Sequence, residues 1–174
     1  EVTCYRSPEK EARVIELMRG DENFMQGYAA IDDGGNLVRV LDIIRGKRLD
    51  RHIAEIKCDH RTYFVDHLKP IITRFLVSVE AICSLHEYGF KHGDIRRDHL
   101  YVDQADGHYC WIDFDYDFYS PERPFALDLF GLGNVLLYIA GRHNYRPFVG
   151  RENPAWGQRV LDTLDTGDLS LVSS

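Results

Sequence analysis

The sequence lacks the features that would place it at once in several common protein classes. Its four cysteines are scattered and form no Cys-x-x-Cys pair, which argues against a zinc site. No run approaches the roughly 18 apolar residues of a membrane-spanning helix. No basic start is followed by an apolar run, so a signal peptide is not expected either. These absences predict a cytoplasmic protein without a membrane span.

Positive charge is also scarce. The chain carries 21 Lys and Arg against 28 Asp and Glu, which gives a formal net charge of -7. Nucleic acids and anionic membrane surfaces are bound mainly through Lys and Arg, so we expect no nucleic-acid partner. What is present is ordinary for a globular protein. The 174 residues, of which 44% are hydrophobic, suit one domain with its own core.

The hydrophobic pattern separates helical from extended segments. Ser7-Pro8 predicts a helix start, and the apolar stripe that follows ends at Gly20. Two strands, 24–31 and 37–44, flank a hairpin turn. The other expected elements are an irregular helix over 50–67, a helix from Pro70 to Gly89, strands at 100–102 and 109–112, a buried helix over 127–139 and a short helix near 156–164. Helices and strands do not alternate, which predicts an α+β fold.

Two groups of acidic residues carry the chemical signal. Asp94 lies in a polar run after the long helix, with Arg96 close by, and Asp113 ends an apolar strand. A carboxylate at the end of a buried strand is well placed to hold a hard cation. A carboxylate in a loop can orient a nucleophile or accept its proton. This pattern suits magnesium-assisted phosphoryl transfer. The alternative is a solvated acidic surface, with His92 packed in the core.

Three motifs resemble those of the protein-kinase-like family. The run from His92 to Leu100 resembles the catalytic loop, and His92-Gly93-Asp94 is the form typical of aminoglycoside and choline kinases. Asp113-Phe114-Asp115 follows 19 residues after Asp94 (113 − 94) and resembles the metal-binding motif. Asp128 begins a segment similar to the helix whose Asp braces the catalytic loop. The resemblance implies a kinase-like fold, of either the small-molecule or the atypical bacterial serine/threonine type.

On this resemblance the chain divides into two parts. Residues 1–45 would form a partial N-lobe, made of one helix and a β-hairpin, and the hinge. Residues 46–174 would form a mostly helical C-lobe that ends in a loose tail. The Gly-rich loop and the Lys-bearing strand of the family have no counterpart before Glu11. We therefore expect a truncated N-lobe, or a chain that is a fragment of a longer protein.

The resemblance also implies which residues would bind ATP. Glu11 corresponds to the helix Glu that pairs with the phosphate-binding Lys of the family. Leu41 corresponds to the gatekeeper, while the carbonyl of Asp42 and the amide of Ile44 would bond to adenine. Tyr101 would form the floor of the pocket. A plain buried strand is the alternative interpretation for Leu41 and Ile44, and it is compatible with the first.

The same comparison suggests roles in phosphoryl transfer. Asp94 would orient or deprotonate the attacking hydroxyl, and Arg96 would neutralise the γ-phosphate. Asp113 would bridge magnesium to the phosphates. His99 stands where the family has a metal-binding Asn, and an imidazole nitrogen suits manganese better than magnesium. Asp115 replaces the Gly of the metal motif, which suggests a fixed loop.

The expected function is ATP-dependent transfer of the γ-phosphate to a hydroxyl, on a protein Ser/Thr or on a small molecule, with magnesium or manganese. One alternative is a catalytically impaired pseudokinase that serves as a nucleotide-binding or interaction module. Another is a metal-dependent hydrolase built on the His and Asp residues. Asp98-His99 has the reverse order of the His-Asp pair of phosphohydrolases, which disfavours the hydrolase.

Overall fold

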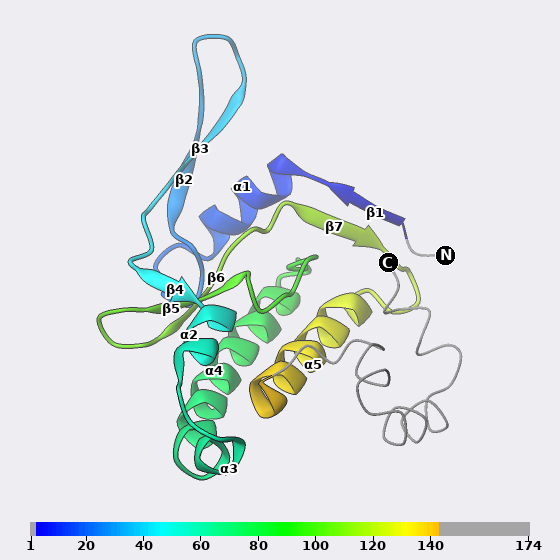
Figure 1. The fold of residues 1–174 in the computed structure, drawn as a ribbon. Coiled ribbons are helices and arrows are strands. Elements are labelled where there is room, and N and C mark those ends of the chain that lie inside the picture. Colours follow the sequence, from blue (N-terminus) through cyan, green and yellow to red (C-terminus); the bar gives the residue numbers. More distant parts are fainter. Residues whose placement is uncertain (1–2, 143–174) are drawn as a thin grey trace, which may run out of the picture. The chain divides into compact units, whose positions relative to one another are not determined.

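The computed structural model describes residues 3–142, and Figure 1 shows how their helices and strands are arranged. In chain order the elements are β1 (Thr3–Arg6), α1 (Pro8–Leu17), β2 (Gly27–Ile31), β3 (Leu37–Leu41), β4 (Gly46–Arg48), α2 (Leu49–Glu55), α3 (His60–Thr62), the π-helical turn η1 (Tyr63–His67), α4 (Leu68–Glu87), β5 (Leu100–Asp103), β6 (Tyr109–Trp111), β7 (Tyr116–Tyr119) and α5 (Ala126–Gly141). All named strand pairs are antiparallel, in three small sheets. The predicted α+β class is confirmed. The helix expected near 156–164 and the expected loose tail lie outside the described residues.

Helix α1 begins as the sequence predicts. The Ser7 hydroxyl accepts a hydrogen bond from the Lys10 amide at 3.2 Å, and Pro8 opens the helix. The helix ends at Leu17, three residues before Gly20, which adopts a φ of 85° in the turn that follows. Its buried face includes two charged residues, Lys10 and Glu11. Buried charges require partners, so this face must meet polar groups.

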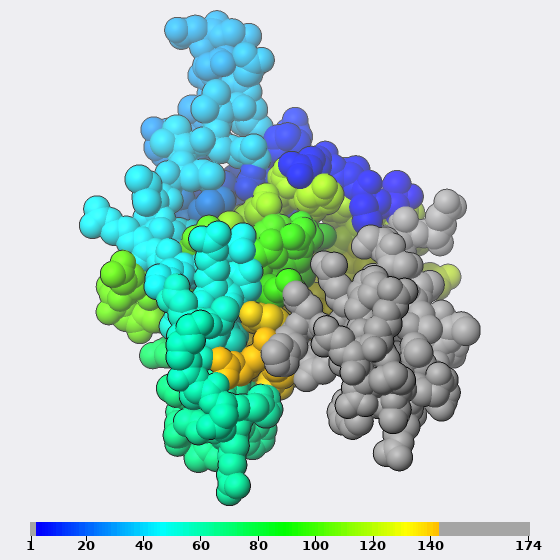
Figure 2. All heavy atoms as spheres, in the orientation of Figure 1, coloured from blue at the N-terminus to red at the C-terminus, as the bar shows by residue number. Residues whose placement is uncertain are grey.

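Strands β2 and β3 form a hairpin that extends away from the helices (Figures 1 and 2). Asp32 closes its turn by accepting hydrogen bonds from the amides of Gly34 and Asn36. Strand β2 starts at Gly27, later than predicted, because Phe24 turns into the core and makes only an isolated bridge to Trp111. Strand β3 ends at Leu41, so the predicted strand to residue 44 is three residues too long.

The sheet β4-β5-β6 packs on the long helix α4. The indole of Trp111, fully buried, donates a hydrogen bond to the Ser78 carbonyl of α4 at 2.9 Å. Helix α4 begins at Leu68, so Pro70 lies in its first turn rather than at its start. The expected irregular helix over 50–67 is divided into α2, α3 and η1. Helix α4 ends at Glu87, and a short link connects it to residues 92–99.

Helix α5 corresponds to the predicted apolar helix but is buried on one face only. Asp128, Leu132 and Ile139 are buried, whereas Leu129 and Leu137 are 59% and 55% exposed. The predicted buried helix is therefore present and buried on one face, because apolar content alone does not tell how many faces of a helix are covered. Among residues 3–142, no helix has the length and apolar content that crossing a membrane requires.

Strands β1 and β7 pair with each other, from Thr3 opposite Tyr119 to Arg6 opposite Tyr116. The sequence pattern does not predict this pair, because each strand has only four residues and mixes polar with aromatic side chains. The pairing brings the start of the described chain beside the segment that follows Asp113-Phe114-Asp115. It thereby fixes the approach of α1 to that segment.

Candidate functional site

Loop 92–99 is held at its start by a buried carboxylate of α5. Asp128 is fully buried and accepts hydrogen bonds from the amides of His92, at 2.8 Å, and Gly93, at 2.9 Å. Its third partner is the His86 ring, at 2.8 Å. Burial alone would raise the pKa of Asp128, but the His86 hydrogen bond, the nearby His92 and the two amides lower it further than burial raises it. Asp128 therefore positions the backbone of the loop.

The same loop is also fastened to α1. The Lys10 ammonium donates hydrogen bonds to the carbonyl oxygens of His92, at 2.9 Å, and Tyr116. Burial lowers the pKa of Lys10 to about 8, although nearby carboxylates including Asp117 and Asp128 oppose this. One buried cation thus connects α1, loop 92–99 and the segment after Asp113. No motif in the sequence marks Lys10, because its partners lie 82 and 106 residues away along the chain.

Gly93 can only be a glycine in this arrangement. Its φ is 90°, and a Cβ atom there would overlap with the carbonyl oxygen of Tyr116. This close approach of two backbone segments explains the Gly of His92-Gly93-Asp94 in physical terms. The same Tyr116 carbonyl also accepts a hydrogen bond from Lys10.

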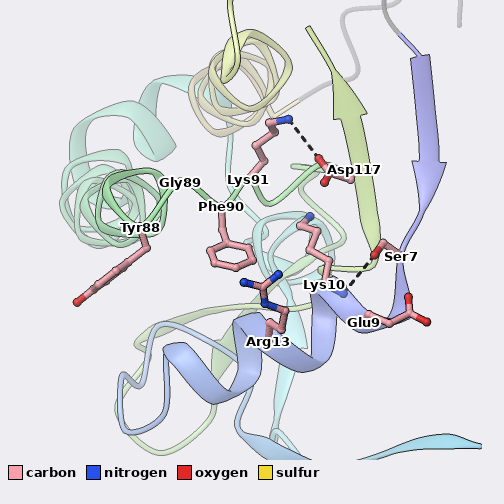
Figure 3. A pocket seen from close by; sticks show the side chains of 9 residues that line it. All are labelled: Ser7, Glu9, Lys10, Arg13, Tyr88, Gly89, Phe90, Lys91 and Asp117. Atoms are coloured by element: carbon pink, nitrogen blue, oxygen red, sulfur yellow. Dashed lines mark hydrogen bonds and ion pairs between the residues drawn. The ribbon is translucent and has the colours of Figure 1, made fainter. Parts of the chain in front are cut away.

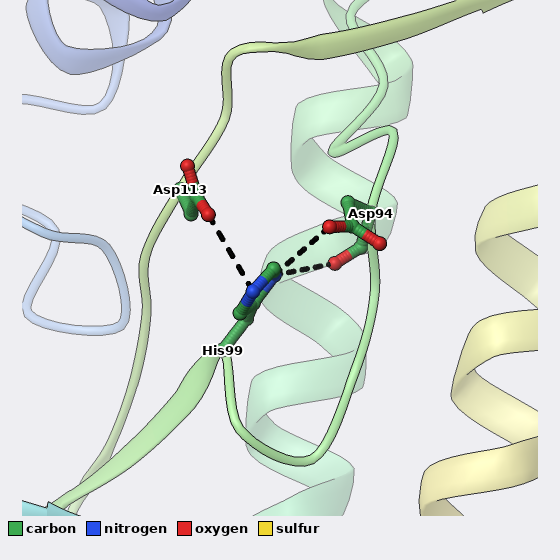
Figure 4. A group of neighbouring side chains, drawn as sticks. All are labelled: Asp94, His99 and Asp113. Atoms are coloured by element: carbon green, nitrogen blue, oxygen red, sulfur yellow. Dashed lines mark hydrogen bonds and ion pairs between the residues drawn. The ribbon is translucent and has the colours of Figure 1, made fainter. Parts of the chain in front are cut away.

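Asp94, His99 and Asp113 come together into one group, which we call the acid–histidine cluster (Figure 4). One ligand atom from each lies within 4.8 Å of the others. The His99 Nδ1 atom is 2.9 Å from the carbonyl oxygen of Asp94, which can only accept, so Nδ1 carries the hydrogen. In the neutral ring, the lone pair of Nε2 then faces a carboxylate oxygen of Asp113 at 3.4 Å. Two electron-rich atoms this close require a cation between them or a proton on the ring.

Asp94 lies in an environment that favours its neutral form. Burial raises its pKa, partly offset by His99 and Arg96, and the carboxylate of Asp113 raises it further. Arg96 is 3.8 Å from Asp94, but its fork makes two hydrogen bonds to Asp98, at 3.0 and 2.7 Å. The structure therefore brings Arg96 to the edge of the cluster and directs its guanidinium mainly to Asp98.

The segment 113–115 is tightly constrained. Asp113 has a φ of 68°, unusual for a residue other than glycine, and its side chain is 40% exposed. Phe114 is fully buried against His92. The Asp115 carboxylate is buried and accepts a hydrogen bond from Arg6 at 3.0 Å. Asp113 is therefore the only acid of this motif that faces the cluster and solvent.

The residues expected to bind the nucleotide lie on β3, the link after it, and β5. Asp42 and Ile44 are outside any strand, and within residues 3–142 neither the Asp42 carbonyl nor the Ile44 amide has a hydrogen-bond partner. Leu41 is 40% exposed, so a plain buried strand is the wrong interpretation for this segment. Ile44 packs partly buried against the core. Tyr101 lies half-buried on β5, opposite Arg48 and Cys110.

Glu11 is buried on α1, and its cationic partner among residues 3–142 is Arg39 of β3. The resemblance implies a Lys in this place. The ion pair of Glu11 is thus formed by an Arg of the hairpin and not by a Lys. The sequence does not predict this partner, because Arg39 lies in an apolar strand and belongs to no recognisable motif.

A cavity of about 430 Å³ lies beside α1, and Figure 3 labels its lining residues. Lys10 and Arg13 of α1 face Phe90 and Lys91, which connect α4 to loop 92–99, and Asp117 of β7 completes the wall. No residue of the acid–histidine cluster lines it. A second group of possible ligands, Asp103, Asp106 and His108, lies in the turn between β5 and β6.

Comparisons with known proteins agree with the architecture. No family model matches the sequence. A segment of 107 residues is 25% identical to the death-associated protein kinase dapk-1 of Caenorhabditis elegans and spans 61% of this chain but 7% of that protein. The structure is similar to that of the Cydia pomonella granulovirus kinase PK-1, with a TM-score of 0.63 and 17% identity, covering 98% of this chain and 68% of the other. It is also similar to a mutant of the Mycobacterium tuberculosis PknI kinase domain, with a TM-score of 0.55 and 14% identity over 90% and 72% of the two chains.

The chain therefore has the protein-kinase-like fold, as the order of its motifs predicts. The division into a partial N-lobe with the hinge (residues 1–45) and a C-lobe (residues 46–174) stays a prediction.

Proposed function

We propose that this protein binds ATP with a divalent cation and transfers the γ-phosphate to a hydroxyl of a protein Ser/Thr or of a small molecule. The observation that carries the proposal is the acid–histidine cluster, in which Asp94 and Asp113 approach His99 from opposite sides (Figure 4). Two carboxylates within reach of one imidazole suit a divalent cation, because the cation relieves their mutual repulsion. The protein-kinase-like fold supports the same proposal but does not by itself establish the activity.

The cluster fits a metal ion through the donors it presents. Asp113 supplies an accessible carboxylate, and His99 supplies Nε2, whose lone pair is fixed by the Nδ1 hydrogen bond to Asp94. A bound divalent cation would neutralise charge on the β- and γ-phosphates. Because one donor is a nitrogen, the set should prefer manganese to magnesium, since magnesium selects oxygen ligands.

Asp94 is the residue we assign to the acceptor hydroxyl. Its raised pKa makes its carboxylate a better proton acceptor than an ordinary Asp. Its loop is held by Asp128 and Lys10, so its position depends little on the acceptor. Within residues 3–142 the Asp42 carbonyl and the Ile44 amide have no hydrogen-bond partner, so both could bond to an adenine edge, with Leu41 and Tyr101 as further pocket residues.

A pseudokinase that binds a nucleotide without transferring phosphate is the second candidate. Two observations favour it. Arg96 is engaged by Asp98, which leaves its charge partly neutralised. Asp115 accepts a hydrogen bond from Arg6, which fixes the metal motif in one conformation, and a fixed motif is compatible with a site that only binds a nucleotide.

Calorimetry with ATP and Mn²⁺ or Mg²⁺ tests nucleotide binding. We expect wild type to bind ATP more tightly with Mn²⁺ than with Mg²⁺, and His99→Asn to reverse this order. Asp113→Ala should lose the metal dependence, with an affinity loss of about tenfold or more. Asp106→Ala, which removes a carboxylate from the β5–β6 turn, is the matched control and should behave as wild type. Metal-dependent binding that survives in Asp113→Ala would contradict the assignment.

Phosphate release from ATP separates the two candidate functions. We expect slow metal-dependent turnover in wild type and a loss of at least about 100-fold in Asp94→Asn, which keeps the shape and removes the base. Equal nucleotide affinity in both proteins confirms that binding is intact. Nucleotide binding with no turnover in wild type would favour the pseudokinase.

A further inference from the structure

We propose that the cavity beside α1 binds a small aromatic carboxylate, and that Lys10 and Arg13 hold its carboxylate group. The cavity has a volume of about 430 Å³, which lies within the range of sites for small molecules. No residue of the acid–histidine cluster lines it, so this inference goes beyond the proposed phosphoryl transfer and does not depend on it. The lining combines a surplus of positive charge with an aromatic wall (Figure 3).

The charged side chains of the lining leave positive charge on the side of α1. The cations are Lys10, Arg13 and Lys91, and the carboxylates are those of Glu9 and Asp117. Lys91 and Asp117 form an ion pair with each other at 3.3 Å. Glu9 is exposed, and its carboxylate points away from Lys10 and Arg13 in Figure 3. The surplus charge therefore lies at Lys10 and Arg13, and its size matches an anion with a single charge.

Lys10 is the buried cation of the cavity. The residue is 6% exposed, and its ammonium donates hydrogen bonds to the carbonyl oxygens of His92 and Tyr116. An ammonium carries three N–H groups, so one of them has no acceptor among residues 3–142. Burial lowers the pKa of Lys10 to about 8, because the nearby carboxylates compensate its charge only in part. A carboxylate in the cavity would supply both an acceptor and a negative charge.

Arg13 supplies the second cation, three residues after Lys10 on α1. Residues at this spacing are neighbours on the surface of a helix, so the two side chains can reach one ligand. The Arg13 guanidinium lies over the Phe90 ring, 5.0 Å from the ring centroid. Among residues 3–142 it forms no ion pair and no side-chain hydrogen bond. Its planar fork is therefore available, and it matches the two oxygens of a carboxylate.

The wall that faces α1 favours an aromatic body on the ligand. Tyr88 and Phe90 line it, with Gly89 between them. No atom lies within 4 Å of the place that a Cβ of Gly89 would occupy, so the wall is open at this point. An aromatic ring can pack on such a wall in an offset arrangement. Inorganic phosphate lacks this contact, and its second negative charge would lie near Asp117 without a cation to balance it.

NMR titration of the full chain with benzoate tests the proposal. Wild type should bind benzoate with a dissociation constant on the order of 1 mM, and the amide signals of Gly89, Phe90 and Lys91 should shift. Benzamide has the ring without the charge, and acetate has the charge without the ring. Both should bind at least about tenfold more weakly than benzoate, and so should inorganic phosphate.

Variants of Arg13 connect the binding to the proposed residues. Arg13→Gln should weaken benzoate binding about tenfold, the loss expected for charged hydrogen bonds. Arg13→Lys keeps the charge but not the fork, so it should lose only several-fold. Arg51→Gln removes an exposed Arg of α2 and is the matched control, with benzoate affinity unchanged.

Each outcome supports or overturns the site. It is overturned if wild type shows no saturable benzoate binding, if benzamide binds as tightly as benzoate, or if Arg13→Gln binds like wild type. Tighter binding of phosphate than of benzoate overturns the carboxylate class. ATP with Mn²⁺ should not displace benzoate, and displacement would place the anion in the nucleotide site instead. A failure of ATP to bind overturns the proposed function and leaves this inference unaffected.

Discussion

Gly93 shows how much of the loop geometry depends on one residue. Its backbone has a φ of 90°, and the Tyr116 carbonyl occupies the space of a Cβ atom. Gly93→Ala should therefore lower the free energy of unfolding by about 3 kcal/mol, combining backbone strain with a displaced strand β7. Urea denaturation measures this loss.

Gly20→Ala is the matched control for that prediction. Gly20 has a φ of 85° but no atom within 4 Å of the position of a Cβ. It should lose only about 1 kcal/mol, from strain alone. Equal losses in the two variants would show that the approach of Tyr116 does not constrain the loop.

Single residues also show what the sequence could predict about the site. Asp94, His99 and Asp113 belong to local motifs, and in the structure their ligand atoms lie within 4.8 Å of one another, while their roles stay predictions. Lys10 and Arg39 act through contacts that no local pattern encodes. Lys10 meets a carbonyl 82 residues away, and Arg39 meets a glutamate on another element. Only the tertiary fold brings either residue to its partner.

At the level of elements, α1 depends on one side chain for its attachment to loop 92–99. Replacing Lys10 by Met removes the donor that the carbonyl groups of His92 and Tyr116 share, so both carbonyls lose a hydrogen bond. Lys10→Met should lower stability by about 2 kcal/mol, because the two lost hydrogen bonds outweigh the relief of burying a charge. Hydrogen exchange of the loop amides should accelerate by a larger factor than exchange in α4.

Lys69→Met is the matched control for Lys10→Met. Lys69 is exposed on α4, so its replacement should change stability by less than about 0.5 kcal/mol. If Lys10→Met matched Lys69→Met in both measurements, the anchoring role of Lys10 would be wrong.

The elements themselves were predictable where periodicity was strong and caps were present. Helix α1 begins at Ser7 as expected, and α4 and α5 exist close to their predicted ranges. Failures have separate causes. Phe24 resembles a strand residue but is drawn into the core, which shortens β2. Strands β1 and β7 need each other to form, so neither has a signal of its own.

At the level of the whole molecule, His92 makes stability depend on pH. Burial lowers its pKa from 6.5 to about 3, although Asp128 opposes the shift. Below pH 6.5 the unfolded chain binds a proton that the folded protein excludes. The stabilisation is therefore complete above pH 6.5 and is lost as the pH falls toward 3. Burial also lowers the pKa of His52, which adds to the same trend.

Urea midpoints measured between pH 7.5 and pH 5 test this dependence. The midpoint of wild type should fall steadily below pH 6.5, and His92→Gln should flatten the fall. His60→Gln, which replaces an exposed ring, should retain it. An unchanged slope in His92→Gln would assign the effect to other groups.

The acid–histidine cluster has a further consequence for folding. Its three residues flank the β5–β6 hairpin, whose pairing from Leu100 opposite Trp111 to Val102 opposite Tyr109 brings the two flanks together. The entropy lost on closing a loop grows with the logarithm of its length, so this closure costs less than joining Lys10 to His92 across 82 residues. The acidic groups are thus assembled by a pairing that is local in sequence, whereas the Lys10 cation of α1 reaches the same loop only through a long-range contact that forms at greater entropic cost.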